Sequence, residues 1–495
     1  MPTLRDLIAK GSLIGNHRPC PRAVVDAAMW EDLAAGLAAG QGTLLGLWGE
    51  ARAVHMAVLG GEPGAIAVAS LECPAGRYPS VGRHHAPAIR LERAIQDLYG
   101  LLAEGLPDPR PWLDHGCWGR GGTVAGVYDF LPTEGEGLHQ IPVGPVHAGI
   151  IEPGHFRFTA NGETVVRLEA RLGYVHKGIE GLMAGAEPSH AARLAGRLSG
   201  DSMVACSLAF ARAVEAALDI EAPPRAHWLR GLIAELERLA NHLGDIGAIC
   251  NDASFALMQA HCAVLRERVL RTAEISFGHR LMRDCILPGG VERDLGPDGV
   301  AAILALVAEL RRRFPALVEL YDNTASLQDR TVGTGILQSD LARRFGAGGY
   351  VGRASGRGFD ARRAIGYPPY DRLSFEIPVL AEGDVNARVW IRIREVEQSL
   401  GLVEQILAEL PAGPIRAEWS APGEPCEGLA LVEGFRGDIL AWLRIGGDGR
   451  VERCHMRDPS WFQWPLLEAA VEGNIVADFP LCNKSFNCSY SGHDL

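Results

Sequence analysis

Long apolar runs are missing from this 495-residue sequence, because none reaches the roughly 18–20 apolar residues that cross a bilayer. The first residues, MPTLRDLIAKGSLIG, also lack the long apolar core of a signal peptide. These two absences exclude a membrane-spanning or secreted class. We therefore expect a chain that is cytoplasmic and soluble by itself.

Basic clusters and paired cysteines are also absent. The chain has 48 Lys and Arg against 60 Asp and Glu, a net charge of −12, which excludes nucleic acid as a partner. None of the eleven cysteines stands in a CxxC spacing, which argues against a structural zinc site. In a cytosolic chain, such scattered cysteines predict buried free thiols.

Two regions of different pattern flank a stretch rich in Pro and Gly. Residues 1–105 mix short β-like runs such as GTLLGLWGE with helical ones, which predicts a small N-terminal α/β domain. Residues 106–140 carry several Pro and Gly and predict an extended, exposed linker. Residues 141–495 then form the second expected domain, which opens with an alternating pattern around Asn161-Gly162 that predicts a hairpin.

The second domain is expected to be mainly helical. Apolar residues from Trp228 to Leu243 recur at helical spacing after Pro224, and further helical patterns cover roughly 256–282, 298–313 and 384–410. Short β-like pieces reappear at 428–447. The expected fold class is therefore α+β: the N-terminal domain is joined to a helix bundle with small peripheral sheets.

Several motifs in a fixed order carry a resemblance to one superfamily. They are YPSVGRHHAPAIRLERAIQDLYGL, GPVHAGIIEPGHFRF, LGYVHKGIE, ELERLANHL, ILPGGV, RASG, GDVNARVWIRIREVEQSL and EGFRGDI. The first resembles the 30-kDa-type subunit of respiratory complex I. The others resemble the large subunit of membrane-bound [NiFe] hydrogenases and the 49-kDa-type subunit of complex I. Their fusion resembles the large subunits of formate hydrogenlyase and hydrogenase-4, and it implies a hydrogenase-large-subunit fold over 141–495.

The resemblance also shows what the sequence has lost. Where the hydrogenase segment has two metal-binding cysteines, this chain has Ser199 and Ser202. A serine hydroxyl is a hard ligand that stays protonated at neutral pH, whereas nickel and iron take soft thiolates. At the C-terminus, Cys488 matches the first of two further thiolate positions, and Ser491 or Gly492 falls near the second. At most one of the four ligands remains.

A quinone pocket of the complex I type is the next alternative. His147 matches the first histidine of its GPxH motif, but Ile151 stands where the second histidine would reach the quinone. Gly200 stands in place of the tyrosine that hydrogen-bonds the quinone, while Asp252 matches an Asp that backs the lost histidine. Ile and Gly side chains donate no hydrogen bond. Quinone therefore stays possible, with Ser199, Ser202 and Tyr490 as alternative donors.

Four further candidates have a functional and a structural interpretation. His176 pairs with Glu180 either structurally or on a proton path. Arg157 and Arg353 either line the cleft, as their resemblance implies, or serve buried ion pairs. His147 likewise either serves the pocket or holds a turn.

Two acidic residues have similar alternatives. Asp201 lies between the two serines and either carries protons or caps the helix expected to start at Ser202. Asp252 either belongs to the pocket or caps the next helix.

The resemblance implies a subunit of a membrane-bound, energy-converting complex, peripheral on the cytoplasmic side of the inner membrane. The expected partners are a small subunit that carries a [4Fe-4S] cluster, a ferredoxin-like subunit and complex I-like, antiporter-type membrane subunits. This chain itself carries no cluster motif and no expected metal. Either its degenerate cleft reduces an unidentified, quinone-like or other acceptor, or the chain is a scaffold that couples to ion or substrate translocation without redox turnover.

The sequence predicts that the purified protein holds no stoichiometric nickel, because both pairs of thiolate positions are broken. Elemental analysis of the chelator-washed protein by mass spectrometry should find far less than one nickel per chain. Nickel close to one per chain, retained after chelation, would contradict the prediction.

Overall fold

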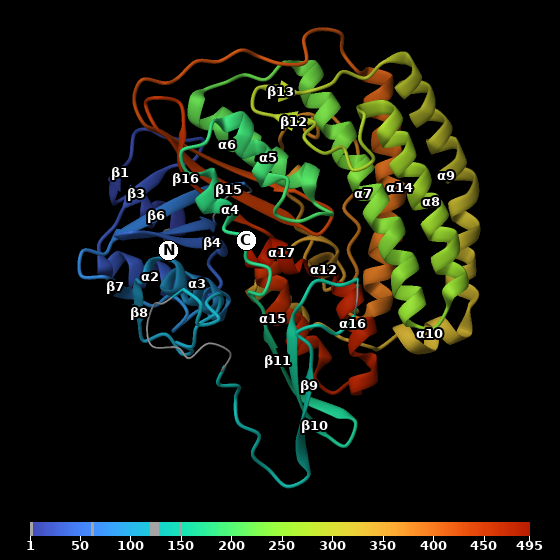
Figure 1. The fold of residues 1–495 in the computed structure, drawn as a ribbon, viewed down its shortest axis with the longest axis horizontal. Helices are drawn as coiled ribbons and strands as arrows, with labels where there is room; N and C mark the ends of the chain where they lie inside the picture. The colour runs from blue at the N-terminus through green and yellow to red at the C-terminus, as the bar shows by residue number, and fades with distance from the viewer. Residues whose placement is uncertain (1–2, 61–63, 119–127, 149) are drawn as a thin grey trace.

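The computed structural model describes residues 3–60, 64–118, 128–148 and 150–495 (Figure 1). Its N-terminal part is a five-stranded sheet in the order β1-β3-β6-β5-β4, covered by helices. Nearly every residue of the long β4–β5–β6 meander is buried, so both faces of this part of the sheet are covered. The elements of this part are α1 (Leu4–Ile8), β1 (Ser12–Leu13), β3 (Arg22–Val24), α2 (Ala27–Ala38), β4 (Thr43–Glu50), β5 (Ala53–Leu59), β6 (Ile66–Glu72), β7 (Arg77–Pro79), η1 (Ala86–Ala88), α3 (Ile89–Tyr99) and β8 (Leu102–Glu104).

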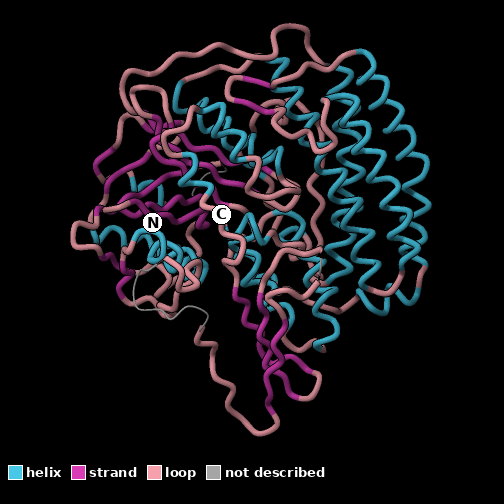
Figure 2. Tube along the Cα trace, in the orientation of Figure 1, coloured by secondary structure: helices cyan, strands magenta, loops and turns pink. Residues whose placement is uncertain are grey.

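A bundle of long helices forms the opposite side of the molecule (Figures 1 and 2). Its innermost helix, α7 (Pro224–Asp252), starts with Pro at its first position, where no intrahelical N–H is needed. The apolar stripe expected between Trp228 and Leu243 is fully buried. The other bundle helices are α8 (Ala256–Phe277), α9 (Pro297–Asn323) and α14 (Val385–Glu409).

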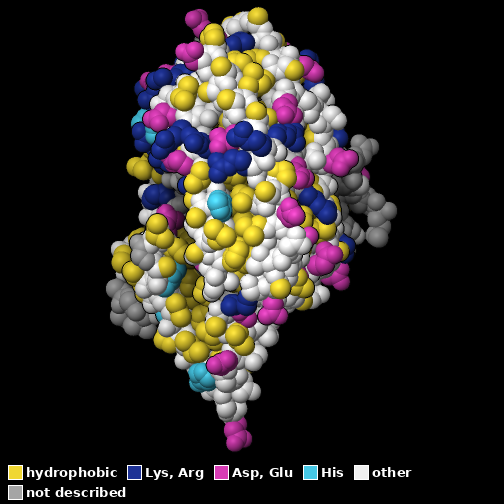
Figure 3. Space-filling view, turned by 90° about the vertical axis from the view of Figure 1, so that its right-hand side faces the viewer, with side chains coloured by type: hydrophobic (Ala, Val, Ile, Leu, Met, Phe, Trp, Pro, Cys, Tyr) yellow, Lys and Arg dark blue, Asp and Glu magenta, His cyan; other side chains and the backbone are white. Residues whose placement is uncertain are grey.

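Exposed arginines of the outer helices form a band across the surface of the bundle (Figure 3). Arg271 and Arg280 share Glu267, while Arg311 pairs with Glu404. Leu257, Val264, Ile275 and Leu304 on the same helices are each at least 45% exposed. The outer bundle therefore presents apolar side chains beside paired charges.

A four-stranded sheet joins the two halves in the centre. Its strands run in the order β16-β15-β14-β2, and β2 comes from the N-terminal part and pairs with β14 in parallel. Helix α6 packs on β14 so closely that a Cβ on Gly428 would collide with the carbonyl of Ala213. The elements are β2 (His17–Arg18), α6 (Met203–Leu218), β14 (Cys426–Glu433), β15 (Asp438–Ile445) and β16 (Val451–Arg457).

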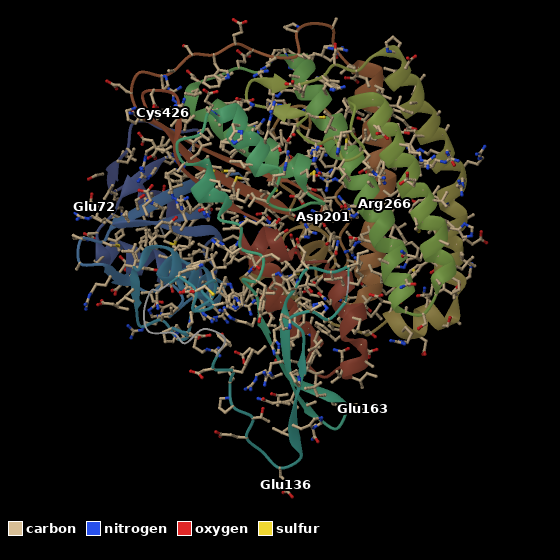
Figure 4. All side chains as sticks on the ribbon, in the orientation of Figure 1. Glu72, Glu136, Glu163, Asp201, Arg266 and Cys426 are labelled. Atoms are coloured by element: carbon tan, nitrogen blue, oxygen red, sulfur yellow. The ribbon has the colours of Figure 1, made fainter. Side chains whose placement is uncertain are left out.

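A three-stranded sheet, β11-β10-β9, projects below the body and carries Glu136 near its tip (Figure 4). Its base packs on the C-terminal helices through Phe156 and Trp464. These elements are β9 (Leu138–Val143), β10 (His155–Asn161), β11 (Thr164–Arg171), α15 (Ser460–Val471), η2 (Val476–Asp478), α16 (Phe479–Phe486) and α17 (Tyr490–Asp494). The remaining short elements are α4 (Ile179–Met183), α5 (Pro188–Ala195), β12 (Ile286–Leu287), β13 (Gly290–Val291), α10 (Ala325–Thr331), α11 (Ser339–Arg344), α12 (Gly349–Arg353) and α13 (Ala361–Ala364).

The mixed α+β class and the hairpin at Asn161-Gly162 are confirmed. The expected domain boundaries at 105 and 141 stay a prediction, and residues 119–127 of the expected linker lie outside the described residues. The prediction that the linker is exposed along its whole length is wrong, because Trp112 and Leu113 are buried and their backbone N–H groups donate to Asp97. Across the described ranges, helices long and apolar enough to cross a membrane are not found.

A buried ion network connects the bundle to the central sheet. The Arg353 guanidinium, at the end of α12, lies 2.6 Å from Glu395 on α14 and 2.9 Å from Glu433 on β14. Glu395 also accepts from His242 of α7 at 2.7 Å. Arg362 pairs with Asp360 at 2.7 Å and extends the network to α7. Because these groups are almost fully buried, each depends on its partners to compensate for lost hydration.

Replacing Arg353 with Met should therefore lower the free energy of unfolding by about 3–5 kcal/mol, because three buried carboxyl groups lose a shared cation. Urea unfolding followed by tryptophan fluorescence measures the loss. The matched control is Arg311→Met, which removes a half-exposed pair and should cost less than about 1 kcal/mol. Equal losses in the two variants would contradict a structural role for the network.

Candidate functional site

A pocket of about 540 Å³ lies where five parts of the chain meet. They are the loop after β9, the loop between α5 and α6, the end of α7, the turn between β14 and β15, and the C-terminal segment from α16 to α17. Figure 4 labels Asp201, which lies near the middle of the molecule beside the C-terminal helices. Six residues singled out from the sequence line this pocket: His147, Ser199, Asp201, Asp252, Cys488 and Tyr490.

The centre of the pocket is an ion pair between Asp201 and Arg436. One guanidinium nitrogen donates to Asp201 Oδ2 at 2.6 Å and the other to Oδ1 at 3.2 Å, so the pair is bidentate. Burial alone would raise the pKa of the Asp201 carboxyl, but the charge and hydrogen bonds of Arg436 outweigh burial and hold this pKa below its usual value. Asp201 is therefore a carboxylate at neutral pH.

Arg436 is fixed in place by the turn between β14 and β15. Its guanidinium stacks over the ring of Phe435 at 4.6 Å, and its Nε donates to the carbonyl of Asn487 at 2.6 Å. The turn approaches α12 so closely that a Cβ on Gly349, which has a φ of +60°, would collide with the carbonyl of Arg436. The hydrogen bond to Asn487 and the stacking on Phe435 hold the guanidinium where it reaches Asp201.

Both serines of the former ligand positions donate to Asp201 Oδ1, Ser199 at 2.7 Å and Ser202 at 3.2 Å. Ser199 also lies 2.8 Å from the hydroxyl of Ser489 in the C-terminal segment. Ser202 in turn accepts from Arg436 at 3.0 Å. The hydroxyls are thus satisfied by protein groups, and a continuous chain of hydrogen bonds runs from Ser489 to Arg436.

The expectation that Asp201 caps the following helix is wrong. Helix α6 begins at Met203, and the Asp201 side chain is bound to Arg436 and the serines instead. The first backbone N–H groups of α6, at Val204 and Ala205, donate to Glu237 of α7 at 2.7 and 3.1 Å. Burial raises the pKa of Glu237 to about 8 although these two bonds oppose the shift. A carboxyl on the neighbouring helix therefore anchors the loop.

His147 and Tyr490 form the aromatic side of the pocket. Their rings lie 6.2 Å apart, and Tyr490 Oη accepts from Asn483 at 3.4 Å. Burial lowers the pKa of His147, and among the described residues its Nε2 has no hydrogen-bond partner. The imidazole is therefore neutral at pH 7 and has a free ring nitrogen for a ligand or water.

Asp252 closes the pocket at the end of α7. Burial raises the pKa of its carboxyl, and the ammonium of Lys484 and a hydrogen bond from Asn251 oppose the shift without cancelling it. The capping alternative is wrong, because α8 begins at Ala256 with no side-chain cap among the described residues. Lys484 also lines the pocket, so a cation and a carboxyl face the same space.

A nickel–iron centre does not fit these residues. Cys488 is the one cysteine among the pocket's lining residues, and burial raises the pKa of its thiol far above the usual range. A metal of this kind needs thiolates, and the hydroxyls at 199 and 202 already donate to Asp201. Within the described ranges, no three His, Cys, Asp or Glu side chains are grouped to hold a metal ion.

Of the ten sequence candidates, Ser202 is buried beside Asp201 without lining the pocket, and three others lie away from it. Arg157 stacks over Phe130 and lines a different cavity at the base of the projecting sheet. Arg353 is fully buried in the ion network. His176 Nδ1 donates to the carbonyl of Asp494 rather than to Glu180.

The expected His176–Glu180 pair is therefore wrong. Glu180 binds Arg453 at 2.8 Å and His455 at 2.9 Å, and both residues belong to β16. These partners lie more than 270 positions away in the sequence, so the one-turn spacing of His176 and Glu180 did not reveal them.

Sequence reasoning missed Arg436, Lys484 and Ser489. Arg436 lies inside EGFRGDI, which served as a motif of resemblance without a role for its arginine. A buried carboxylate needs a cation, so the position of Asp201 between two serines indicated that a basic residue must lie nearby in the folded chain. The sequence could not identify that residue, because Arg436 is 235 positions away.

Comparison with known proteins places the chain among large subunits of the hydrogenase and complex I type. Residues 252–425 match the family model "Respiratory-chain NADH dehydrogenase, 49 Kd subunit". The chain is 33% identical to formate hydrogenlyase subunit 5 of Escherichia coli, over 84% of this chain and 77% of the relative. It is 32% identical to hydrogenase-4 component G of the same organism, over 87% and 78%.

The chain therefore belongs to the superfamily of group 4 [NiFe] hydrogenase large subunits and complex I 49-kDa-type subunits. A solved structure of the membrane-bound sulfane sulfur reductase, an archaeal respiratory membrane complex, matches with a TM-score of 0.69. The identity is 28%, over 73% of this chain and 99% of that one. The relatives of this chain are subunits of membrane-bound hydrogenase and complex I-like complexes.

Replacing Asp201 with Asn should lower the free energy of unfolding at pH 7 by about 2 kcal/mol, because the buried Arg436 loses its counter-ion. The loss is smaller than for a fully buried pair, since 36% of the Asp201 side chain is exposed. The folded pKa of Asp201 is lowered, so the advantage of the wild type is present above the unfolded pKa and is lost as pH falls through the folded pKa.

Urea unfolding at a series of pH values between 7 and 3 tests both parts of this prediction. The control, Asp340→Asn, removes a carboxylate that is 98% exposed and should change stability little at any pH. A constant difference between wild type and Asp201→Asn across the whole range would be inconsistent with an ionised Asp201.

Proposed function

We propose that this chain is the soluble-arm large subunit of a membrane-bound, complex I-like energy-converting complex in which a small polar acceptor, rather than a NiFe centre, occupies the Asp201 pocket. The printed names of its relatives, formate hydrogenlyase subunit 5 and hydrogenase-4 component G, support the type of complex. Electrons reach the pocket from a [4Fe-4S] cluster in a neighbouring small subunit. A ferredoxin-like subunit and antiporter-type membrane subunits complete the proposed assembly on the cytoplasmic side of the inner membrane.

The observation that carries this proposal is the hydrogen-bonded chain Ser489–Ser199–Asp201–Ser202. Hydroxyl groups can accept one proton while they release another, and Asp201 at the centre supplies a carboxylate. Reduction of an acceptor consumes protons, so a proton path belongs next to the site where electrons arrive. The pocket has this path on one wall and a neutral His147 on another, whose Nε2 has no partner among the residues that the structure describes.

The pocket suits a small polar acceptor better than a long quinone. Arg436, Lys484 and Asn483 supply cationic or amide donors around the space of about 540 Å³. A quinone head group remains a candidate acceptor, because Ile150, Ile151 and Phe479 add an apolar side near the mouth. Each of these acceptors needs hydrogen-bond donors, which the pocket contributes from three separate segments.

A scaffold without redox turnover is the second candidate function. It is favoured by the closure of the Asp201 network, because Arg436 and both serines already satisfy the carboxylate without any ligand. In this alternative, the network transmits no protons and only holds the C-terminal segment against α6. The two candidates differ in whether the serine hydroxyls must exchange protons.

The double variant Ser199→Ala/Ser202→Ala distinguishes the two functions. It keeps the Asp201–Arg436 pair and removes the proton-exchanging hydroxyls, so a working pocket should slow at least tenfold. The purified complex is reduced with dithionite, and cluster reoxidation is followed optically after addition of a short-chain quinone or of polysulfide. Co-elution of the neighbouring subunits shows that the variant assembles.

The matched control is Ser12→Ala/Ser374→Ala, which alters two exposed serines and should leave the rate unchanged. Full activity of Ser199→Ala/Ser202→Ala would eliminate a catalytic role for the loop and leave the scaffold function. A loss of activity in both double variants would point to a general defect instead of a role for this pocket.

A further inference from the structure

A second large cleft, of about 970 Å³, lies between the N-terminal part and the segment from α11 to α13. It shares no lining residue with the Asp201 pocket, and the proposed function does not use it. One wall consists of the turn that joins α2 to β4, together with His85. The opposite wall carries Arg343, Arg344 and Arg357.

The arginine wall has more positive than negative charge. Among the described lining residues Asp340 is the sole carboxylate, and its side chain is 98% exposed where it pairs with Arg343. An ion pair so exposed neutralises little of the local potential. Arg344 has no ion-pair partner among the described residues, so about two positive charges face the cleft in a chain whose net charge is −12.

Arg357 differs from its neighbours because it is held in a fixed orientation. Its guanidinium stacks over Phe359 at 4.6 Å, and one nitrogen donates to the carbonyl of Ala347 at 2.9 Å. The remaining N–H groups have no hydrogen-bond partner among the described residues. A planar guanidinium with free donors matches the geometry of phosphate oxygens.

The opposite wall is built from small residues and one buried histidine. Ala38, Ala39, Gly40 and Gly42 bring no charged side chain to the cleft, so a ligand can approach their backbone. His85 is 2% exposed, and neither of its ring nitrogens has a hydrogen-bond partner in the described part of the chain. Burial and the nearby Arg344 lower the pKa of His85 to about 4, so it is neutral at pH 7.

An imidazole without a hydrogen-bond partner, close to Arg344 and two further guanidinium groups, is unfavourable unless a ligand joins them. A buried polar nitrogen without a partner costs about 1–3 kcal/mol, and clustered cations repel each other. A multivalent anion resolves both problems, because its oxygens accept hydrogen bonds from the guanidinium groups and from the imidazole N–H. The volume of the cleft lies within the range of small-molecule sites.

We propose that this cleft binds a small phosphate-bearing anion. Arg343, Arg344 and Arg357 hold the anion on one side, and the imidazole N–H of His85 donates a hydrogen bond to it from the other. The glycine- and alanine-rich turn after α2 gives the phosphate room next to the backbone. Because the two walls belong to the N-terminal part and to the helical part, the bound anion bridges the two halves of the molecule.

Isothermal titration calorimetry on the purified complex tests the site, with inorganic pyrophosphate and inorganic phosphate as probes. We expect saturable binding near one site per chain, which weakens as sodium chloride is raised. The variant Arg343→Gln/Arg344→Gln should weaken binding at least tenfold. Its control, Arg311→Gln/Arg312→Gln, changes a similar exposed pair on α9 and should shift the affinity less than twofold.

The two probes identify the group that is recognised. Equal affinity for phosphate and pyrophosphate assigns the site to a single phosphoryl group, and preference for pyrophosphate assigns it to a diphosphate, as in a nucleotide. The absence of binding at millimolar concentration overturns the proposal, as does equal weakening in both arginine variants. An electron cryomicroscopy map with pyrophosphate gives an independent test: density between Arg344 and His85 supports the site, and density elsewhere overturns it.

Discussion

The buried cation of Arg353 is the constraint on which the arrangement of the large domain depends. It joins α12, α14 and β14 where Glu395 and Glu433 are almost fully buried, so neither carboxyl group can be left without a partner. The end of β14 is therefore fixed relative to the bundle, and the turn that follows has one position. Arg436 lies in that turn, so the orientation of the pocket is a consequence of a network that never touches it.

Ser199 and Ser202 stand where the family resemblance implies metal-binding cysteines. A serine has nearly the size of a cysteine but donates a hydrogen bond where a thiolate would donate an electron pair to a metal, and Asp201 accepts from both serines. The loop therefore organises an ion pair with two hydroxyls, which is a polar centre without soft ligands.

Periodic patterns in the sequence predicted helices and strands, whereas contacts between residues far apart in the sequence could not be predicted from it. The spacing of Leu229 to Leu243 and the Asn161-Gly162 turn placed α7 and the projecting hairpin, but the pattern after 298 ended at 313 while α9 continues past Pro315 to Asn323. The resemblance located six pocket residues. The capping alternative for Asp201 and the pairing of Glu180 with His176 were wrong, because the actual partners, Arg436 and residues of β16, come together only in the folded chain.

The parallel pairing of β2 with β14 has a consequence for how the two halves belong together. Strand β2 (residues 17–18) is the edge strand and pairs with the first residues of β14, and the turn that carries Arg436 follows the last residue of β14. If the two halves were made as separate polypeptides, the first would have to lend a strand to the second, and their interface would be a shared sheet.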